Sequence, residues 1–166
     1  MNRPSLPMVD TPVKILVVDD HPNTATMLAR AISQLGPQVK VASATSASEA
    51  LRHAGNDVVD ILITDMVMPE MTGLELIEQL NSNPAGRPAF SFLITAYDVP
   101  GLKVSANRLK VKEVIVKPVH PERICQIVAR AMDEMHQAKT VHKEPIPQKS
   151  FTILIADDQP DNLTLL

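Results

Sequence analysis

The chain has 166 residues, which is enough for one ordinary domain with a short extension and a sizeable hydrophobic core. Hydrophobic residues make up 45% and charged residues 21%, the balance of a globular protein that folds in water. The formal net charge of −3, without a long basic run, gives no support for nucleic-acid binding, and we predict none. No apolar run approaches the roughly 20 residues of a membrane-spanning helix, so we predict no membrane insertion.

The single cysteine, Cys125, cannot form a disulfide within the chain, which fits a reducing cytosol. Its aliphatic neighbours predict a small core thiol rather than a nucleophile. Residues 1–12, predicted to be an N-terminal extension, contain no apolar stretch of signal-peptide length. We therefore expect a soluble, cytoplasmic protein. Its core must be aliphatic, because the chain has one Tyr, three Phe and no Trp.

Short aliphatic runs alternate along the chain with stretches of helical periodicity. In chain order, the predicted strands are residues 15–18, 39–42, 61–63, 90–94 and 114–116. Runs that are continuously apolar are typical of parallel strands covered on both faces.

A helix is predicted after each strand. The first carries an apolar stripe over 25–35 and ends before Gly36-Pro37. The second begins with a pattern that resembles a capping box, Ser46 with Glu49. The third covers 72–80, the fourth lies between 100 and 110 with few apolar anchors, and the last covers 124–135. This alternation predicts an α/β fold: a doubly wound, five-stranded parallel sheet with helices on both faces.

Polar side chains follow the aliphatic runs at one end of the predicted sheet. Asp19 and Asp20 follow the first strand, Asp65 the third, Thr95 the fourth and Lys117 the fifth. Ligands of such sheets bind beyond the carboxyl ends of the strands. Each residue alone would be a turn or cap residue, but together they predict one pocket.

Three carboxylates cannot all stay ionised in one small pocket without a counterion. Mg²⁺, with Mn²⁺ as the alternative, takes oxygen ligands and would relieve the repulsion, and Lys117 supplies a second positive charge. A metal and an ammonium facing a fixed carboxylate suit phosphoryl transfer. The carboxylate can itself be the nucleophile and form an aspartyl phosphate.

The segments DD, DMVMPEMTG, TA and KP, in this order, resemble the receiver domain of bacterial two-component response regulators. The spacings of 45, 30 and 22 residues from Asp20 through Asp65 and Thr95 to Lys117 match that family's pattern. The resemblance covers residues 13–136 and implies a flavodoxin-like fold with strand order 2-1-3-4-5.

The resemblance also implies roles at the site. Asp65 would accept a phosphoryl group from a phosphohistidine of a sensor histidine kinase or a histidine phosphotransfer protein, and would lose it slowly. Asp20, Asp65 and the backbone carbonyl of Val67 would bind Mg²⁺ directly, and Asp19 would bind it through a water. Lys117 would pair with Asp65 and then with a phosphoryl oxygen.

Thr95 would donate its hydroxyl to another phosphoryl oxygen and so report phosphorylation to the surface. The family usually has an aromatic residue three positions before the lysine, where this chain has Val114. Tyr97 is a candidate for part of that role, and an exposed loop tyrosine without it fits equally well. Neither Tyr97 nor Val67 can orient an attacking water, which predicts slow dephosphorylation. His21 is interpreted as a surface loop residue, because oxygen ligands suit Mg²⁺ better.

Two other functions stay open. A magnesium phosphohydrolase with an aspartyl nucleophile would need a second carboxylate two residues after Asp65, where this chain has Val67. A degenerate receiver would act only as a protein-interaction module; the complete acidic set argues against it, and the missing aromatic residue keeps it open.

The end of the chain repeats its beginning. Residues 151–166, FTILIADDQPDNLTLL, follow VKILVVDDHPNTATML at a constant offset of 138 residues. An internal repeat at domain length predicts a second receiver, joined through a linker at 137–150, in a longer protein with an output domain. We expect this fragment to dock on the first domain, on a neighbouring copy, or in a homodimer.

Overall fold

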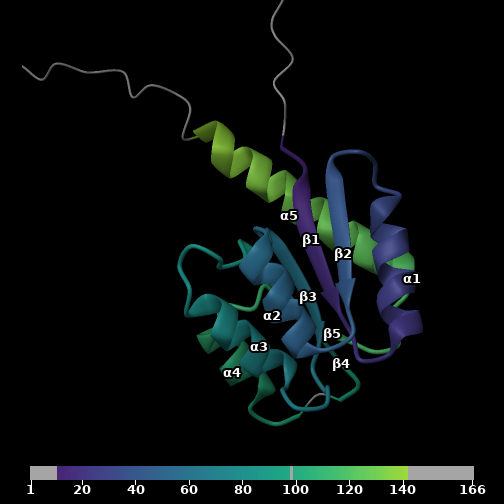
Figure 1. The fold of residues 1–166 in the computed structure, drawn as a ribbon, viewed down its shortest axis with the longest axis vertical. Coiled ribbons are helices and arrows are strands. Elements are labelled where there is room, and N and C mark those ends of the chain that lie inside the picture. Colours follow the sequence, from purple (N-terminus) through teal and green to yellow (C-terminus); the bar gives the residue numbers. More distant parts are fainter. Residues whose placement is uncertain (1–10, 98, 142–166) are drawn as a thin grey trace, which may run out of the picture.

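Residues 11–97 and 99–141 are described by a computed structural model in which strands and helices alternate (Figure 1). The strands are β1 Val13–Val18, β2 Val39–Ala44, β3 Ile61–Asp65, β4 Phe90–Thr95 and β5 Glu113–Val116. The helices are α1 Pro22–Ser33, α2 Ala47–Asn56, α3 Gly73–Asn81, α4 Leu102–Arg108 and α5 Pro121–Val141. All the predicted elements are present in this order.

The strands form one parallel sheet in the order β2-β1-β3-β4-β5, so the predicted α/β fold is confirmed. Several strands extend beyond the aliphatic runs that predict them. β3 continues through Thr64 to Asp65, which lies beside Ile94 of β4. The main-chain ladder accepts any side chain, so polar residues extend a strand beyond its apolar run.

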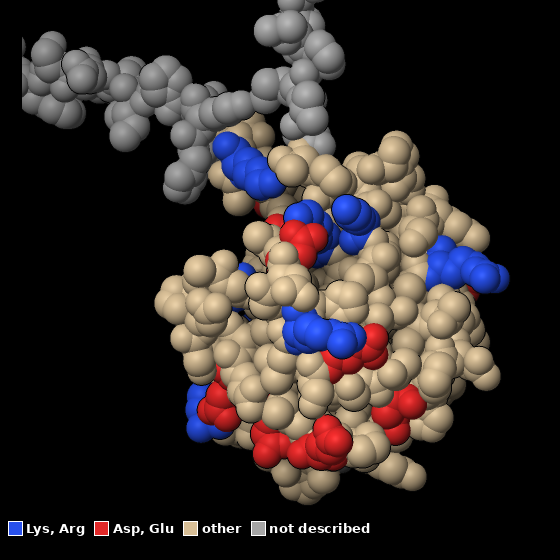
Figure 2. Space-filling view, viewed as in Figure 1, with Lys and Arg blue, Asp and Glu red and all other residues tan. Residues whose placement is uncertain are grey.

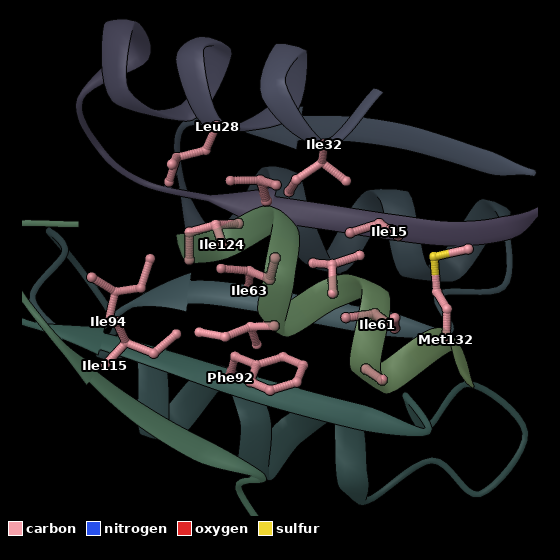
Figure 3. Close-up of a cluster of buried hydrophobic side chains, with 14 of the residues drawn as sticks. Ile15, Leu28, Ile32, Ile61, Ile63, Phe92, Ile94, Ile115, Ile124 and Met132 are labelled. Carbon is pink, nitrogen blue, oxygen red and sulfur yellow. The ribbon is translucent and has the colours of Figure 1, made fainter. Parts of the chain in front are cut away.

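Helices cover both faces of the sheet, α1 and α5 on one face and α2, α3 and α4 on the other (Figure 1). Consecutive strand residues point to opposite faces. Ile15 and Val17 of β1 therefore lie under α1 and α5, and Leu16 and Val18 lie under the other three helices. Figure 3 shows the first of these layers, which contains the buried ring of Phe92. Each such buried side chain contributes about 1.5–3 kcal/mol, so two aliphatic layers hold the sheet.

Side-chain caps define the starts of two helices. At α3, the Thr72 hydroxyl accepts from the Glu75 N–H, and the Glu75 carboxylate accepts from the Thr72 N–H, which makes a complete capping box. The box predicted for α2 is half right. The Ser46 hydroxyl accepts from the Glu49 N–H at 3.1 Å, but the Glu49 carboxylate accepts from the backbone of Thr45.

α5 continues to Val141, so the first residues of the predicted linker at 137–150 are helical. Strong helix formers such as Ala138 and Lys139 carry the helix past the last apolar anchor. The rest of that linker, the predicted second receiver at 151–166 and residues 1–10 of the predicted extension lie outside the described residues. Within the described part, no helix has the length and apolar character to cross a membrane.

Candidate functional site

The register of the sheet brings the predicted site residues to one edge. β1 and β3 pair up to Val18 and Thr64, so Asp19 and Asp65 come next to each other. β4 and β5 pair up to the residue before Lys117. The strand order reverses between β1 and β3, and parallel sheets bind ligands at such switch points.

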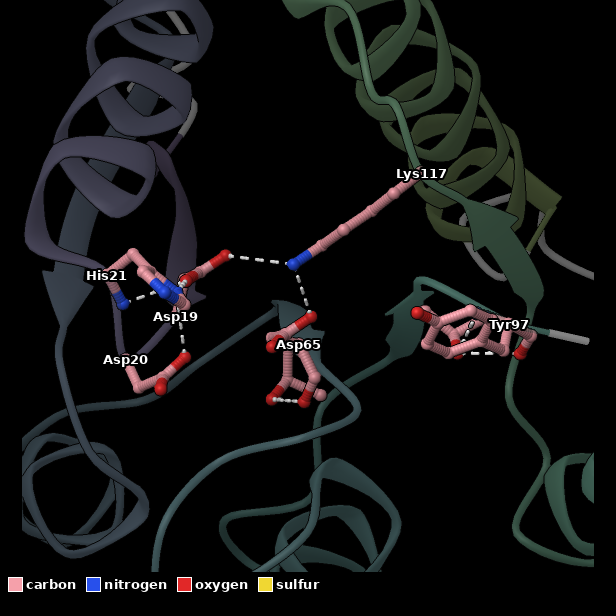
Figure 4. A network of polar contacts seen from close by, with 8 residues as sticks. Asp19, Asp20, His21, Asp65, Tyr97 and Lys117 are labelled. Carbon is pink, nitrogen blue, oxygen red and sulfur yellow. Dashed lines mark hydrogen bonds and ion pairs between the residues drawn. The ribbon is translucent and has the colours of Figure 1, made fainter. Parts of the chain in front are cut away.

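Lys117 reaches across this edge to the carboxylates (Figure 4). Its Nζ donates to Asp65 Oδ1 at 2.9 Å and lies 3.9 Å from Asp19 Oδ2. The side chain of Asp65 is 5% exposed and that of Lys117 is 33% exposed. One ammonium therefore bridges two carboxylates that are almost completely buried.

Burial and charge oppose each other in this pair. Burial raises the pKa of Asp65 above its ordinary value; Lys117 lowers it, and the charges of Asp19 and Asp20 raise it further. Partial burial lowers the pKa of Lys117, but its hydrogen bond to Asp65 and the surrounding carboxylate charges outweigh this, so the pKa is raised. Burial prevails at Asp65 and pairing prevails at Lys117, because Lys117 keeps more contact with water.

Asp19 and Asp20 form a compact group with His21 (Figure 4). One ligand atom from each of the three residues lies within 4.8 Å of the others. Two buried carboxylate oxygens of this group indicate that a cation binds here. Asp19 Oδ2 and Asp20 Oδ1 are buried and receive no hydrogen bond from the described part of the chain. Buried carboxylate oxygens without a donor are costly, and a hard cation such as Mg²⁺ would satisfy them.

The loop after β3, which contains the predicted metal ligand Val67, is tied to the neighbouring elements. The Met66 N–H donates to the Ile94 carbonyl at 2.7 Å, and the Gly73 N–H donates to the Met66 carbonyl at 2.9 Å. A Cβ at Gly73 would lie 2.3 Å from the Asp65 carbonyl oxygen, so only glycine allows α3 to approach this strand. The Val67 side chain points into solvent.

The Thr95 hydroxyl is hydrogen-bonded to the loop that follows β4. It donates to the Tyr97 carbonyl at 2.9 Å and accepts from the Tyr97 N–H at 3.3 Å. Thr95 is buried, whereas Tyr97 is 76% exposed. Val114 packs half-buried in the layer under α2, α3 and α4. The Tyr97 backbone is therefore hydrogen-bonded to the hydroxyl that, according to the family resemblance, would bind a phosphoryl oxygen.

Contacts of two further residues at the site were not predicted from the sequence. His21 is exposed, as expected, but its Nδ1 lies 3.2 Å from Asp19 Oδ1 and 3.1 Å from Asp20 Oδ1. Its position directly after an acid pair was the available signal. Thr64 is fully buried and its hydroxyl donates to the Asp65 carbonyl at 3.1 Å. Its sequence position gave no signal for that bond.

Residues 15–129 match the family model described as the response regulator receiver domain. The chain belongs to this family. It is 34% identical over 114 residues to an uncharacterized 14.6 kDa protein of Leptolyngbya boryana, covering 69% of this chain and 86% of that protein. It is 32% identical over 134 residues to the sensory transduction protein LytT of Enterococcus faecalis, covering 79% of this chain and 54% of LytT.

The fold is also that of solved receivers. A CheY-like response regulator receiver domain protein from Methanospirillum hungatei superimposes with a TM-score of 0.69 at 24% identity, covering 76% of this chain and 98% of that one. The family is a signalling domain of two-component response regulators, and its members are phosphorylation-dependent switches. Receiver domains work with histidine kinases and with output domains, and they bind Mg²⁺ through acidic residues.

Proposed function

We propose that this receiver domain takes a phosphoryl group onto Asp65 from a phosphohistidine of a sensor histidine kinase or a histidine phosphotransfer protein, with Mg²⁺ or Mn²⁺ as cofactor. The observation that carries the proposal is the setting of Asp65. This carboxylate is almost buried, lies 2.9 Å from the Lys117 ammonium, and stands beside the acid pair of β1. Phosphoryl transfer depends mainly on such positioning and on neutralisation of charge.

In the proposed step, an Asp65 carboxylate oxygen forms a bond to phosphorus while the N–P bond of the donor breaks. The electron pair of that bond stays on the donor imidazole, which takes up a proton. Lys117, which pairs with Asp65 before transfer, then donates to a phosphoryl oxygen. Mg²⁺ would be held by Asp20, Asp65 and the Val67 carbonyl, with Asp19 acting through a water, and would supply positive charge to the phosphoryl oxygens.

Tyr97 reads out phosphorylation in this proposal. A hydroxyl has one proton to donate, and Thr95 directs it to the Tyr97 carbonyl. When Thr95 donates to a phosphoryl oxygen instead, the Tyr97 backbone loses its partner and the loop is free to move. Val114 cannot act as an aromatic reporter, so Tyr97, the only tyrosine in the chain, takes that part.

The proposed switch differs from an aspartyl phosphohydrolase in the residue at position 67. A phosphohydrolase needs a general acid there, and the exposed Val67 side chain has no proton to give. It differs from a pure interaction module in having a nucleophile, an ammonium and two unsatisfied carboxylate oxygens at one sheet edge.

Labelling by acetyl phosphate, with and without Mg²⁺, tests the proposal. The wild-type chain should take up one stable phosphoryl group only when Mg²⁺ is present, and Asp65→Asn should take up none. Continuous hydrolysis of acetyl phosphate would favour the phosphohydrolase, and no labelling of the wild type would favour the interaction module. Labelling of Asp65→Asn at the wild-type level would overturn the assignment of Asp65.

We further propose that this domain is the first of a tandem receiver pair in a longer, cytoplasmic protein with an output domain. The repeat of residues 13–28 at 151–166 supports the pair, and the lone Cys125 fits a reducing compartment. Deleting residues 150–166 should leave labelling of Asp65 unchanged and alter the oligomeric state.

A further inference from the structure

The imidazole of His21 lies against the acid pair although it is free to extend into water. Its side chain is 71% exposed, yet Nδ1 lies within 3.2 Å of carboxylate oxygens from both Asp19 and Asp20. Figure 4 shows the ring between the two carboxylates. The exposed ring can therefore contact an ion that binds to these two carboxylates.

The local backbone aims the ring at this position. His21 is the N-cap of α1 and has extended dihedrals, φ −94° and ψ 107°, as expected for a residue before proline. Its N–H donates to Asp19 Oδ1 at 2.9 Å. N-cap side chains often accept a hydrogen bond from the first helical turn, but the His21 ring makes no such bond within α1. The ring is therefore available to the acid pair.

The separations match those of neighbouring ligands around a metal ion. Adjacent ligands of an octahedral ion lie about 3.0 Å apart, which is √2 times a bond of about 2.1 Å. His21 Nδ1 lies 3.1 Å from Oδ1 of Asp20, the carboxylate of the acid pair that is proposed to bind the ion directly. Independently of the ring, Asp19 is almost fully buried, and its Oδ2, which lies 3.9 Å from Lys117 Nζ, receives no hydrogen bond from the described residues. Both observations point to a cation at the acid pair.

We propose that His21 Nδ1 is a further ligand of the cation at the acid pair, and that it raises the affinity of this receiver for ions that bind imidazole, such as Ni²⁺, Co²⁺ and Zn²⁺. The inference rests on the metal site of the proposed function. Mg²⁺ prefers oxygen ligands and gains little from an imidazole, whereas these ions bind nitrogen well. The preference for oxygen ligands that argues against His21 as a ligand holds for Mg²⁺ and does not extend to these ions.

The competing role for His21 is that of a positive counter-charge with no metal bond. The two roles predict opposite effects when the ring is removed. If His21 is a ligand, its removal weakens Ni²⁺ binding and leaves Mg²⁺ binding unchanged. If it is a counter-charge, its removal strengthens the binding of both ions, because a competitor for the carboxylates is gone.

Calorimetric titration of the full chain with Ni²⁺, and separately with Mg²⁺, decides between them. His21→Ala should bind Ni²⁺ at least about tenfold more weakly than wild type and bind Mg²⁺ as wild type does. His136→Ala, which removes an exposed imidazole on α5, is the matched control and should bind both ions as wild type does. Asp20→Asn should weaken both ions and so locate them at the acid pair.

Pulsed electron paramagnetic resonance of the Cu²⁺ complex gives a second readout, because Cu²⁺ also binds imidazole well. The wild type should show coupling to an imidazole ¹⁴N that His21→Ala lacks. Equal or tighter Ni²⁺ binding by His21→Ala, or an Asp20→Asn variant that binds both ions normally, would overturn the inference. Failure of the wild type to label with acetyl phosphate would instead overturn the proposed function, since metal binding is measured here without phosphorylation.

Discussion

Replacing Gly73 with alanine tests how closely α3 must pack against the strand that carries Asp65. The added Cβ would lie 2.3 Å from the Asp65 carbonyl oxygen and 2.8 Å from Leu93 Cδ1, whereas real Cβ contacts stay above 3.0 Å. The leucine methyl can move, but the carbonyl oxygen belongs to a strand that is paired on both sides. The start of α3 therefore has to shift away from β3.

The expected cost follows from two opposing effects. Overpacking a tight site costs about 1–3 kcal/mol, and alanine gains up to about 1 kcal/mol over glycine in a helix. We expect a net loss of about 1–2 kcal/mol in the free energy of unfolding. The Gly73 N–H donates to the carbonyl of Met66, the neighbour of Asp65, so the shift should also slow labelling of Asp65 by acetyl phosphate.

Gly55→Ala is the matched control, because it makes the same change in α2 where the new Cβ meets no atom within 4 Å. It should raise the free energy of unfolding by up to about 1 kcal/mol and leave labelling unchanged. Urea unfolding of both variants and of wild type, with the slopes compared, measures these energies. A Gly73→Ala variant that unfolds at the same or a higher urea concentration than wild type would refute the packing argument.

Three further results are expected. Thr72→Ala should lower the free energy of unfolding by about 1 kcal/mol near neutral pH, because α3 loses its cap. Hydrogen bonds from Thr72 lower the pKa of Glu75 from 4.5, so the contribution of the capping box is complete above pH 4.5 and is lost as the pH falls through the lowered pKa. Urea titrations of Glu75→Ala, which removes the titrating carboxylate, should show a penalty that shrinks in acid, and a constant penalty would count against the box. Installing Asn at Val67 and Glu at Tyr97 should shorten the lifetime of the phosphoryl label, because these side chains can orient water; an unchanged decay rate would refute this account. Tyr97 fluorescence should change on phosphorylation in wild type and stay constant in Thr95→Ala, and an equal change in both would exclude the readout.

The sequence by itself determined the fold class and the edge of the sheet at which Asp19, Asp65 and Lys117 meet. Strands buried on both faces must be continuously apolar, and helices that pack on a sheet must carry an apolar stripe. Burial in the fold can therefore be inferred from the pattern of apolar residues along the chain. Parallel strands end at one edge, so the residues directly after four aliphatic runs had to meet there. The ends of helices follow less directly from the sequence, because an exposed helix end carries no apolar pattern. Helix α5 reaches Val141 on residues that have good helix propensity and no apolar pattern.

Only the tertiary structure decided which of these residues touch. Three contacts depend on strand register and on rotamers. Lys117 bridges Asp65 and Asp19, a loop backbone binds the Thr95 hydroxyl, and the His21 ring lies against two carboxylates. The need for glycine at the start of α3 likewise comes from the distance between a helix and a strand. Periodicity shows which face of a helix or strand is buried, but it does not show which residue of the neighbouring element packs against that face.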